Sequence, residues 1–222
     1  MLVEHEGRSP QVDPGAWVAP TAVLCGDVRV AAGARVLWNA VLVDDGGAVE
    51  IGEQAIVMEQ ALLRGRADHP VRVGASVIVG PHAHVNGATI ADGAFLATGI
   101  SVFPGARVGP SAEVRINGVV HVNSVLPDGE VVPIGWVAVG DPARILPPER
   151  HDDGPAGQPA VPRDRARRLG AEHHGRVRLE PVRLGQQPAE RLGSHELKSI
   201  RGGSAVPAPC SSGRCPYRFV EA

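Results

Sequence analysis

Aliphatic side chains recur every six residues along the first two thirds of the chain. Ala or, once, Val stands two places before each of the first five members, as Ala16 stands before Val18. Neither the 3.6-residue period of a helix nor simple alternation explains this spacing. Two excursions, at 44–47 and 64–72, and one five-residue step interrupt the register. Its eighteen members are Val18, Leu24, Val30, Val36, Leu42, Ile51, Val57, Leu63, Val73, Val79, Val85, Ile90, Leu96, Val102, Val108, Val114, Val120 and Leu126.

A six-residue period predicts a β-solenoid of triangular cross-section. Each hexad forms one flat side. The aliphatic side chain points into the prism, and the residue two places earlier lies at a bend where Ala fits. Three hexads make one coil, so eighteen hexads predict six coils over residues 12–130. Stacked strands lie about 4.8 Å apart, which gives a prism roughly 29 Å tall.

The composition agrees with so narrow a core. Hydrophobic residues make up 43% of the 222 residues, but aromatic residues make up only 3%. A sandwich or a doubly wound sheet normally fills its interior with larger side chains. The composition therefore favours a thin prism lined by Val, Ala, Leu and Ile.

The charge balance divides the chain near residue 150. Residues 1–150 contain 10 Arg and no Lys against 16 acidic residues, a net charge of -6. Residues 151–222 contain 11 Arg and one Lys against 8 acidic residues, a net charge of +4. We therefore expect a hexapeptide-repeat domain with a C-terminal cap at 1–150. The basic, Pro/Gly/Arg-rich tail at 151–222 is expected to be disordered, because it has no sustained apolar period.

Several classes of function are not expected. The net charge of -2 gives no electrostatic reason for a nucleic-acid partner. No apolar run reaches 18 residues and the N-terminus lacks the layout of a signal peptide, so no membrane partner is expected. Cys25, Cys210 and Cys215 form neither a disulfide framework nor a zinc ribbon. We expect reduced thiols in a cytoplasmic protein.

Five segments carry a resemblance to a known family. They are 37–42 (LWNAVL), 51–53 (IGE), 77–80 (VIVG), 86–93 (NGATIADG) and 139–144 (VGDPAR). The pattern resembles the left-handed β-helix of hexapeptide-repeat proteins and, within that superfamily, the γ-class carbonic anhydrase-like family. The resemblance covers about residues 10–146. It implies an all-β fold, a single-stranded left-handed parallel β-helix of about six triangular coils with a largely irregular C-terminal tail, and a homotrimer with sites between subunits.

The resemblance also implies three zinc-binding histidines, but other residues stand at all three positions. These residues are Arg64, Pro81 and Asn86. Arg and Pro cannot ligate zinc, and an amide is a poor ligand beside imidazole. The candidate catalytic residues are then Glu59, Asp45 and Asn86. We expect either a non-catalytic structural homologue or a metalloenzyme that hydrates CO₂ at a relocated site.

A relocated site would draw on the remaining histidines. His82 and His84 lie two residues apart, and His69 lies in the second excursion. Together they could hold zinc or another divalent cation, since imidazole suits these ions. The alternative is that His82 and His84 are bend residues that hydrogen-bond carbonyl groups or line a subunit seam.

The coil geometry places several of these residues together. Three hexads make one coil. The residues that directly follow two aliphatic positions separated by three hexads therefore lie on the same face, in neighbouring coils. One outward column therefore reads Val43, Arg64, Asn86, Phe103 and His121.

On a different face, Glu59 and Pro81 stack in the same way. We expect Arg64, Glu59, Asp45 and His121 at a subunit seam. Arg64 should pair there with Glu59 or Asp45, because a buried Arg needs a partner.

Two other functions stay open. The first is a hexapeptide-repeat acyltransferase with an acyl-CoA donor, in which His121 acts as general base for a small-molecule acceptor. Arg64 or Arg66 could then hold a carboxylate or a phosphate. The second is an interaction scaffold without catalysis. Asn117 and Asn123 are predicted to be turn residues that tolerate left-handed backbone.

Overall fold

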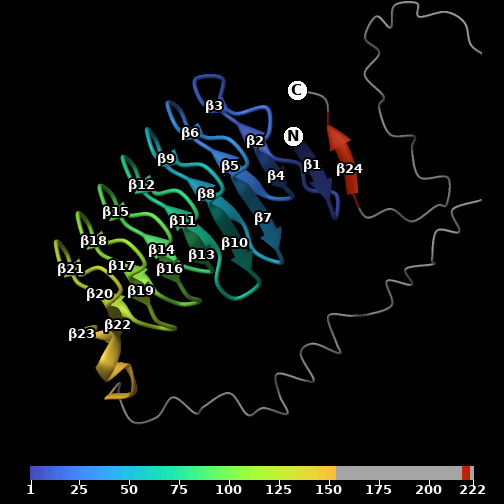
Figure 1. Cartoon of the computed structure of the whole chain (residues 1–222). Coiled ribbons are helices and arrows are strands. Elements are labelled where there is room, and N and C mark those ends of the chain that lie inside the picture. The colour runs from blue at the N-terminus through green and yellow to red at the C-terminus, as the bar shows by residue number, and fades with distance from the viewer. Residues whose placement is uncertain (154–216, 221–222) are drawn as a thin grey trace, which may run out of the picture. The chain divides into compact units, whose positions relative to one another are not determined.

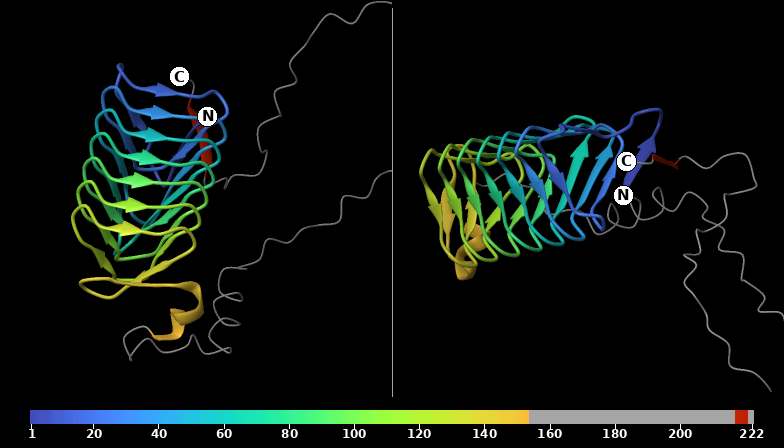
Figure 2. Two further views of the ribbon diagram at one scale, coloured as in Figure 1. Left: turned by 60° about the vertical axis from the view of Figure 1, so that its left-hand side comes forward. Right: turned by 90° about the horizontal axis from the view of Figure 1, so that it is seen from above.

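The structure is a computed structural model, which describes residues 1–150 and the backbone alone of residues 151–153 and 217–220. It is an all-β parallel β-solenoid of about eight turns, with three sheets as its three flat faces (Figure 1). The predicted fold class, a left-handed parallel β-helix, is confirmed. Figure 2 shows the coils stacked along one axis, with the chain passing from face to face in each turn.

Face A holds the longest strands. Its eight parallel strands are β1 (Leu2–His5), β4 (Val23–Cys25), β7 (Val41–Asp45), β10 (Leu62–Arg66), β13 (His84–Asn86), β16 (Ser101–Val102), β19 (Val119–Val120) and β22 (Val137–Val139).

Face B follows each of these strands across one corner of the prism. Its strands are β2 (Gln11–Val12), β5 (Val28–Val30), β8 (Val49–Ile51), β11 (Val71–Val73), β14 (Thr89–Ile90), β17 (Arg107–Val108) and β20 (Val125–Leu126).

Face C completes each turn. Its strands are β3 (Trp17–Val18), β6 (Arg35–Val36), β9 (Ile56–Val57), β12 (Ile78–Val79), β15 (Phe95–Leu96), β18 (Glu113–Val114) and β21 (Val131–Val132). We call the three edges of the prism corners A/B, B/C and C/A, in chain order.

The predicted number of six coils is too small. Four further strand positions extend the series at its ends: Leu2, Val12, Val132 and Ala138. At Val12 and Val132 the small residue two places earlier is absent, because Pro10 and Glu130 stand there. At end coils the bends face solvent, so larger residues fit there.

The interior of the prism is the predicted one. The aliphatic members of the hexads are buried, and Leu24, Val79 and Val85 are 0% exposed. The small residues two places earlier are buried at the bends, as at Ala22. Val18 is only half-buried, because β3 is the edge strand of face C and no further coil covers it.

The corners use left-handed backbone, as predicted for two of them. Asn117 and Asn123 have φ values of 55° and 54°. Asparagine is among the non-glycine residues that adopt this left-handed region most often. Gln54, Gln60 and His82 adopt φ values of 58°, 59° and 56° at equivalent corners.

One acidic residue is buried at the start of the solenoid. Asp44 is 0% exposed, and its Oδ2 accepts a hydrogen bond of 3.0 Å from the backbone N–H of Asp27. The same oxygen lies 3.1 Å from Nη1 of Arg8. Gly26 has a φ of +79°, and a Cβ there would lie 2.9 Å from Cβ of Asp44, so glycine is needed for this approach. Arg8, in the loop between β1 and β2, thus neutralises the buried carboxylate of Asp44.

Antiparallel strands extend face A at both of its edges. β23 (Arg144–Leu146) pairs with β22, and the 3₁₀ helix η1 (Pro148–Asp153) follows it. At the other end, β24 (Tyr217–Val220) pairs with β1. The predicted disorder of the tail concerns residues that lie, apart from these segments, outside the described part of the chain. Among the described residues, no helix is long and apolar enough to cross a membrane.

Candidate functional site

The predicted outward column on face A is present. Arg64 of β10 is paired in register with Val43 of β7 and with Asn86 of β13. The ladder continues from Val85 to Val102 and Val120, which places Phe103 and His121 in the same column. The period of six therefore fixes which side chains share this face.

Arg64 and Arg66 form an arginine cluster around Asp45 on face A. Nε of Arg66 donates a 3.0 Å hydrogen bond to Oδ1 of Asn86, and Nη1 of Arg66 lies 3.0 Å from Oδ2 of Asp45. Arg64 reaches the same Asp45 oxygen at 4.0 Å, and its Nε is buried without a hydrogen-bond partner. Asp45, one of the two predicted partners of Arg64, pairs with it within one chain, although Arg66 is the closer partner; the place of this pair at a subunit seam stays a prediction.

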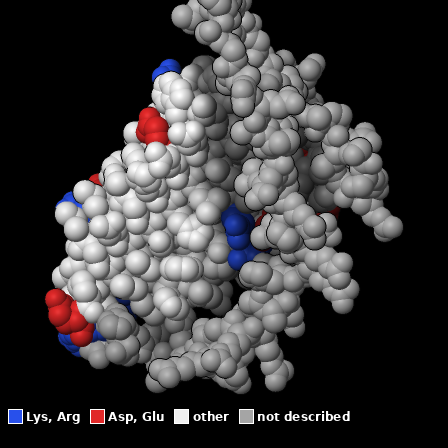
Figure 3. Space-filling view, turned by 45° about the vertical axis from the view of Figure 1, so that its right-hand side comes forward, with Lys and Arg blue, Asp and Glu red and all other residues white. Residues whose placement is uncertain are grey.

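Figure 3 shows the charged side chains on one side of the molecule. The visible described surface is mostly uncharged, and its largest group of Lys and Arg side chains lies near the centre of the view. Two guanidinium groups around one carboxylate leave an excess of positive charge beside Asn86 on face A.

The zinc ion that the resemblance to γ-class carbonic anhydrases implies does not fit the residues at its ligand positions. Two of the three implied ligand positions in this chain carry Arg64 and Asn86, and Asn86 already accepts from the Arg66 guanidinium. A divalent cation would meet two positive groups there, and guanidinium nitrogens offer no lone pair to it.

The three histidines of the relocated site are spread over two corners. His82 lies at corner C/A, where its backbone N–H donates to the carbonyl of Glu59 at 3.0 Å. His84 follows on face A, and His69 lies in the excursion at corner A/B. Within the described part of one chain, no group of three or more His, Cys, Asp or Glu side chains could hold a metal ion. A zinc site from these histidines stays a prediction that needs a second chain.

Glu59 is separated from the arginine cluster in a single chain. It lies at corner C/A, in the position equivalent to Pro81, as predicted. Arg64 therefore pairs with Asp45 rather than with Glu59. Whether Glu59, Pro81 and the Arg64 column meet across a subunit seam stays a prediction.

Two imidazoles flank an aromatic ring on face A. The Phe103 ring lies 6.4 Å from that of His84 and 6.2 Å from that of His121, measured between centroids. The pKa of His84 is lowered by burial first and then by the positive charges of Arg64 and Arg66. His84 is therefore a neutral imidazole near pH 7. The Nδ1 of His121 is buried without a hydrogen-bond partner.

From the sequence, His84 was a candidate metal ligand or seam residue, and Phe103 had a place in the outward column but no chemical role. A signal for His84 as a base was available, because His84 stands two residues before Asn86 and so points from the same face of β13. What the sequence could not supply is the charge environment of His84, which depends on how far two arginine side chains reach between coils.

No family model matches the sequence, and no curated protein matches it. Solved structures with a similar fold include a hexapeptide transferase family protein from Anaplasma phagocytophilum. It is 26% identical, covers 65% of this chain and 82% of its own, and has a TM-score of 0.46.

Two further solved structures are similar. One is a variant of GDP-perosamine N-acetyltransferase from Caulobacter crescentus with CoA and GDP-perosamine; it is 30% identical, covers 61% of this chain and 55% of its own, and has a TM-score of 0.34. The other is UDP-N-acetylglucosamine O-acyltransferase from Moraxella catarrhalis; it is 16% identical, covers 77% of this chain and 82% of its own, and has a TM-score of 0.38. All three are transferases by name, and the first is named as a hexapeptide transferase.

Proposed function

We propose that this chain is a hexapeptide-repeat acyltransferase that uses an acyl-CoA donor and carries its site on face A. The observation behind the proposal is His84, an imidazole whose pKa is lowered by burial and by Arg64 and Arg66. A neutral imidazole on an accessible face can take a proton from an attacking nucleophile. This replaces CO₂ hydration as the preferred function, because the ligand positions for zinc carry guanidinium and amide groups.

The reaction follows from these groups. The acceptor's hydroxyl or amine attacks the thioester carbonyl and gives its proton to His84. The new bond joins the acceptor oxygen or nitrogen to the acyl carbon, and the carbon–sulfur bond breaks. The departing CoA thiolate takes the proton from His84, which restores the neutral imidazole. Arg64, whose Nε lacks a partner, supplies positive charge beside the base.

The test is release of the CoA thiol from acetyl-CoA with a panel of small amines and hydroxyl compounds. Replacing the base, as in His84→Gln, should lower kcat/KM by about 10²- to 10⁴-fold. His5→Gln is the matched control, because His5 lies on β1 at the far end of face A from His84 and away from the arginine cluster. The variant His121→Gln examines the other imidazole. The proposal fails if no acceptor is acylated, or if His84→Gln retains full activity.

The pH dependence follows from the lowered pKa of His84. The base form is complete above that pKa and is lost as pH falls through it. The rate should therefore reach its plateau below the pH expected for an ordinary imidazole, whose pKa is about 6.5. If the rate instead falls with an apparent pKa of about 6.5 or higher, the base is another group.

We also propose that the chain forms a homotrimer, in which corner C/A of one subunit faces the arginine cluster of the next. This arrangement would bring a second chain's Glu59 and His82 to face A. Light scattering of the purified protein at micromolar concentration should give three chains per particle. A monomer that is active in acyl transfer would show that one chain holds the whole site.

A further inference from the structure

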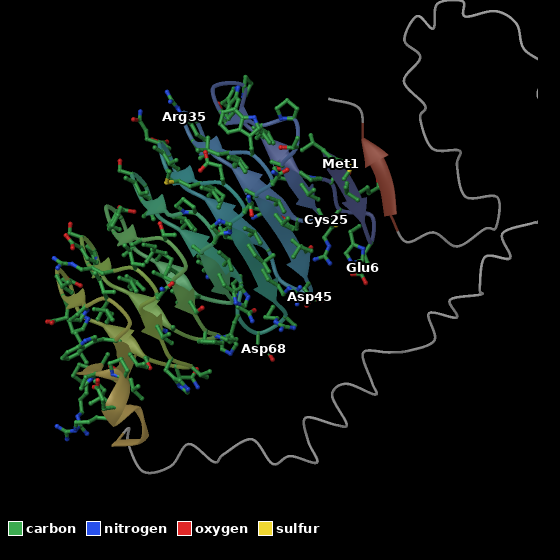
Figure 4. All side chains as sticks on the ribbon, viewed as in Figure 1. Met1, Glu6, Cys25, Arg35, Asp45 and Asp68 are labelled. Carbon is green, nitrogen blue, oxygen red and sulfur yellow. The ribbon has the colours of Figure 1, made fainter. Side chains whose placement is uncertain are left out.

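A cavity of about 280 Å³ lies outside the proposed acyl-transfer site, at corner A/B and on the side of face B. Its walls come from the excursion that carries Asp68 and His69 and from the strands β11, β14 and β17. Figure 4 shows Asp45 and Asp68 along this edge of the prism, whereas Arg35 of face C lies far from both. The residues that line the cavity all come from one chain.

Two glycines make room for the polar walls of this cavity. Gly87 and Gly105 have φ values of +57° and +74°. A Cβ at Gly87 would lie 2.8 Å from Cβ of His69, and a Cβ at Gly105 would lie 3.3 Å from Cε1 of His69 and overlap Oδ1 of Asn123. Because residues 87 and 105 have no Cβ, the side chains of His69 and Asn123 can lie against the backbone beside the cavity.

Four polar side chains reach this cavity without a partner of their own. In residues 1–150, the side chains of His69, Thr89, Arg107 and Asn123 form no hydrogen bond or ion pair within the chain. Arg72 also lines the cavity, but its Nε lies 3.2 Å from Oε2 of Glu50 and its charge is compensated. Arg107 is therefore the uncompensated cation.

These four groups share one chemistry. A guanidinium, an amide N–H₂, a hydroxyl and an imidazole N–H can all donate hydrogen bonds, and together they suit an oxyanion. Arginine binds phosphate through two parallel N–H···O bonds. Asp68, in the same wall, can accept a hydrogen bond from a hydroxyl group of the ligand. The cavity is at the small end of ligand sites, which span about 300–1,000 Å³.

We propose that this cavity binds a small phosphate ester that carries hydroxyl groups. The phosphate lies against Arg107, Thr89 and Asn123, and a hydroxyl group faces Asp68. The site is separate from the acyl-transfer chemistry on face A. The two meet only in the excursion, whose Arg66 faces Asn86 and Asp45 while its His69 faces the cavity.

The experiment is calorimetric titration of the full-length protein with glycerol 3-phosphate at constant ionic strength, with glycerol as the uncharged probe. Arg107→Gln should raise Kd by at least about tenfold, because a charge-assisted hydrogen bond is lost. Asn123→Gly should raise it severalfold, since glycine keeps the left-handed corner but removes the amide.

Arg35→Gln is the matched control. Like Arg107, Arg35 is the exposed first residue of a two-residue strand and precedes a buried valine, but it lies on face C. It should bind glycerol 3-phosphate as the wild type does. Absence of binding at millimolar concentration, or equal weakening in Arg35→Gln and Arg107→Gln, would overturn the proposal. Acyl transfer is measured separately on the same samples, so loss of either proposal leaves the other standing.

Discussion

An acidic residue in the inward column of face A should destabilise the solenoid by a predictable amount. Val102 is 1% exposed and lies between Val85 and Val120 in the ladder. The bore at this level contains only aliphatic side chains and offers an aspartate no partner. We therefore take Val102→Asp as the perturbation.

The magnitude has two parts. Loss of valine burial costs about 2 kcal/mol. To stay neutral at pH 7, the buried carboxyl must raise its pKa from about 3.9 by roughly three units, at about 1.4 kcal/mol each. The total of about 6 kcal/mol is comparable with the whole stability of a typical domain, about 5–15 kcal/mol.

The second part depends on pH in a known direction. A carboxyl whose pKa is raised in the folded state binds more protons there than in the unfolded chain, so the stability of the variant falls as pH rises. Near pH 4 the carboxyl is already about half protonated in the unfolded chain, so little of the protonation cost remains. The difference from wild type should then shrink towards about 2 kcal/mol.

The assay is guanidinium unfolding at pH 7 and pH 4.5 at one protein concentration, followed by tryptophan fluorescence. Ser101→Asp, the outward neighbour on the same strand, is the control and should cost less than about 1 kcal/mol. If Val102→Asp does not fold, Val102→Ala should still cost about 1–3 kcal/mol. Unfolding of Val102→Asp within about 1 kcal/mol of the wild type would refute the inward register.

Two further predictions concern the buried carboxylate. Arg8→Ala should destabilise the protein by about 1–3 kcal/mol, because Asp44 loses its ion pair, while Glu6→Ala should be nearly neutral; equal thermal unfolding of the two variants would contradict this. The pKa of Cys25 is raised by burial and then by Asp44, so iodoacetamide should modify Cys25 more slowly in the folded than in the unfolded protein at pH 8. Mass spectrometry of the Cys25 peptide measures both rates, and equal rates would count against the burial of this thiol.

The sequence by itself determined the solenoid and the membership of its columns. A strict period fixes both the rotation per hexad and the rise per coil, so Leu63, Val85 and Val102 had to stack inside. The same arithmetic placed Arg64, Asn86, Phe103 and His121 outside on one face. It miscounted the coils only at the ends of the solenoid.

The tertiary structure decided what the non-periodic parts do. The excursion at 64–72 breaks the repeat, so no spacing rule could bring His69 over Gly105 or Arg66 to Asn86. The separation of His69 from His82 likewise follows from which corner each segment turns, not from the number of residues between them. The lowered pKa of His84 depends on how far the arginine side chains of one coil reach towards the next. Contacts of this kind are set by side-chain length and direction between coils, which the period of the backbone does not encode.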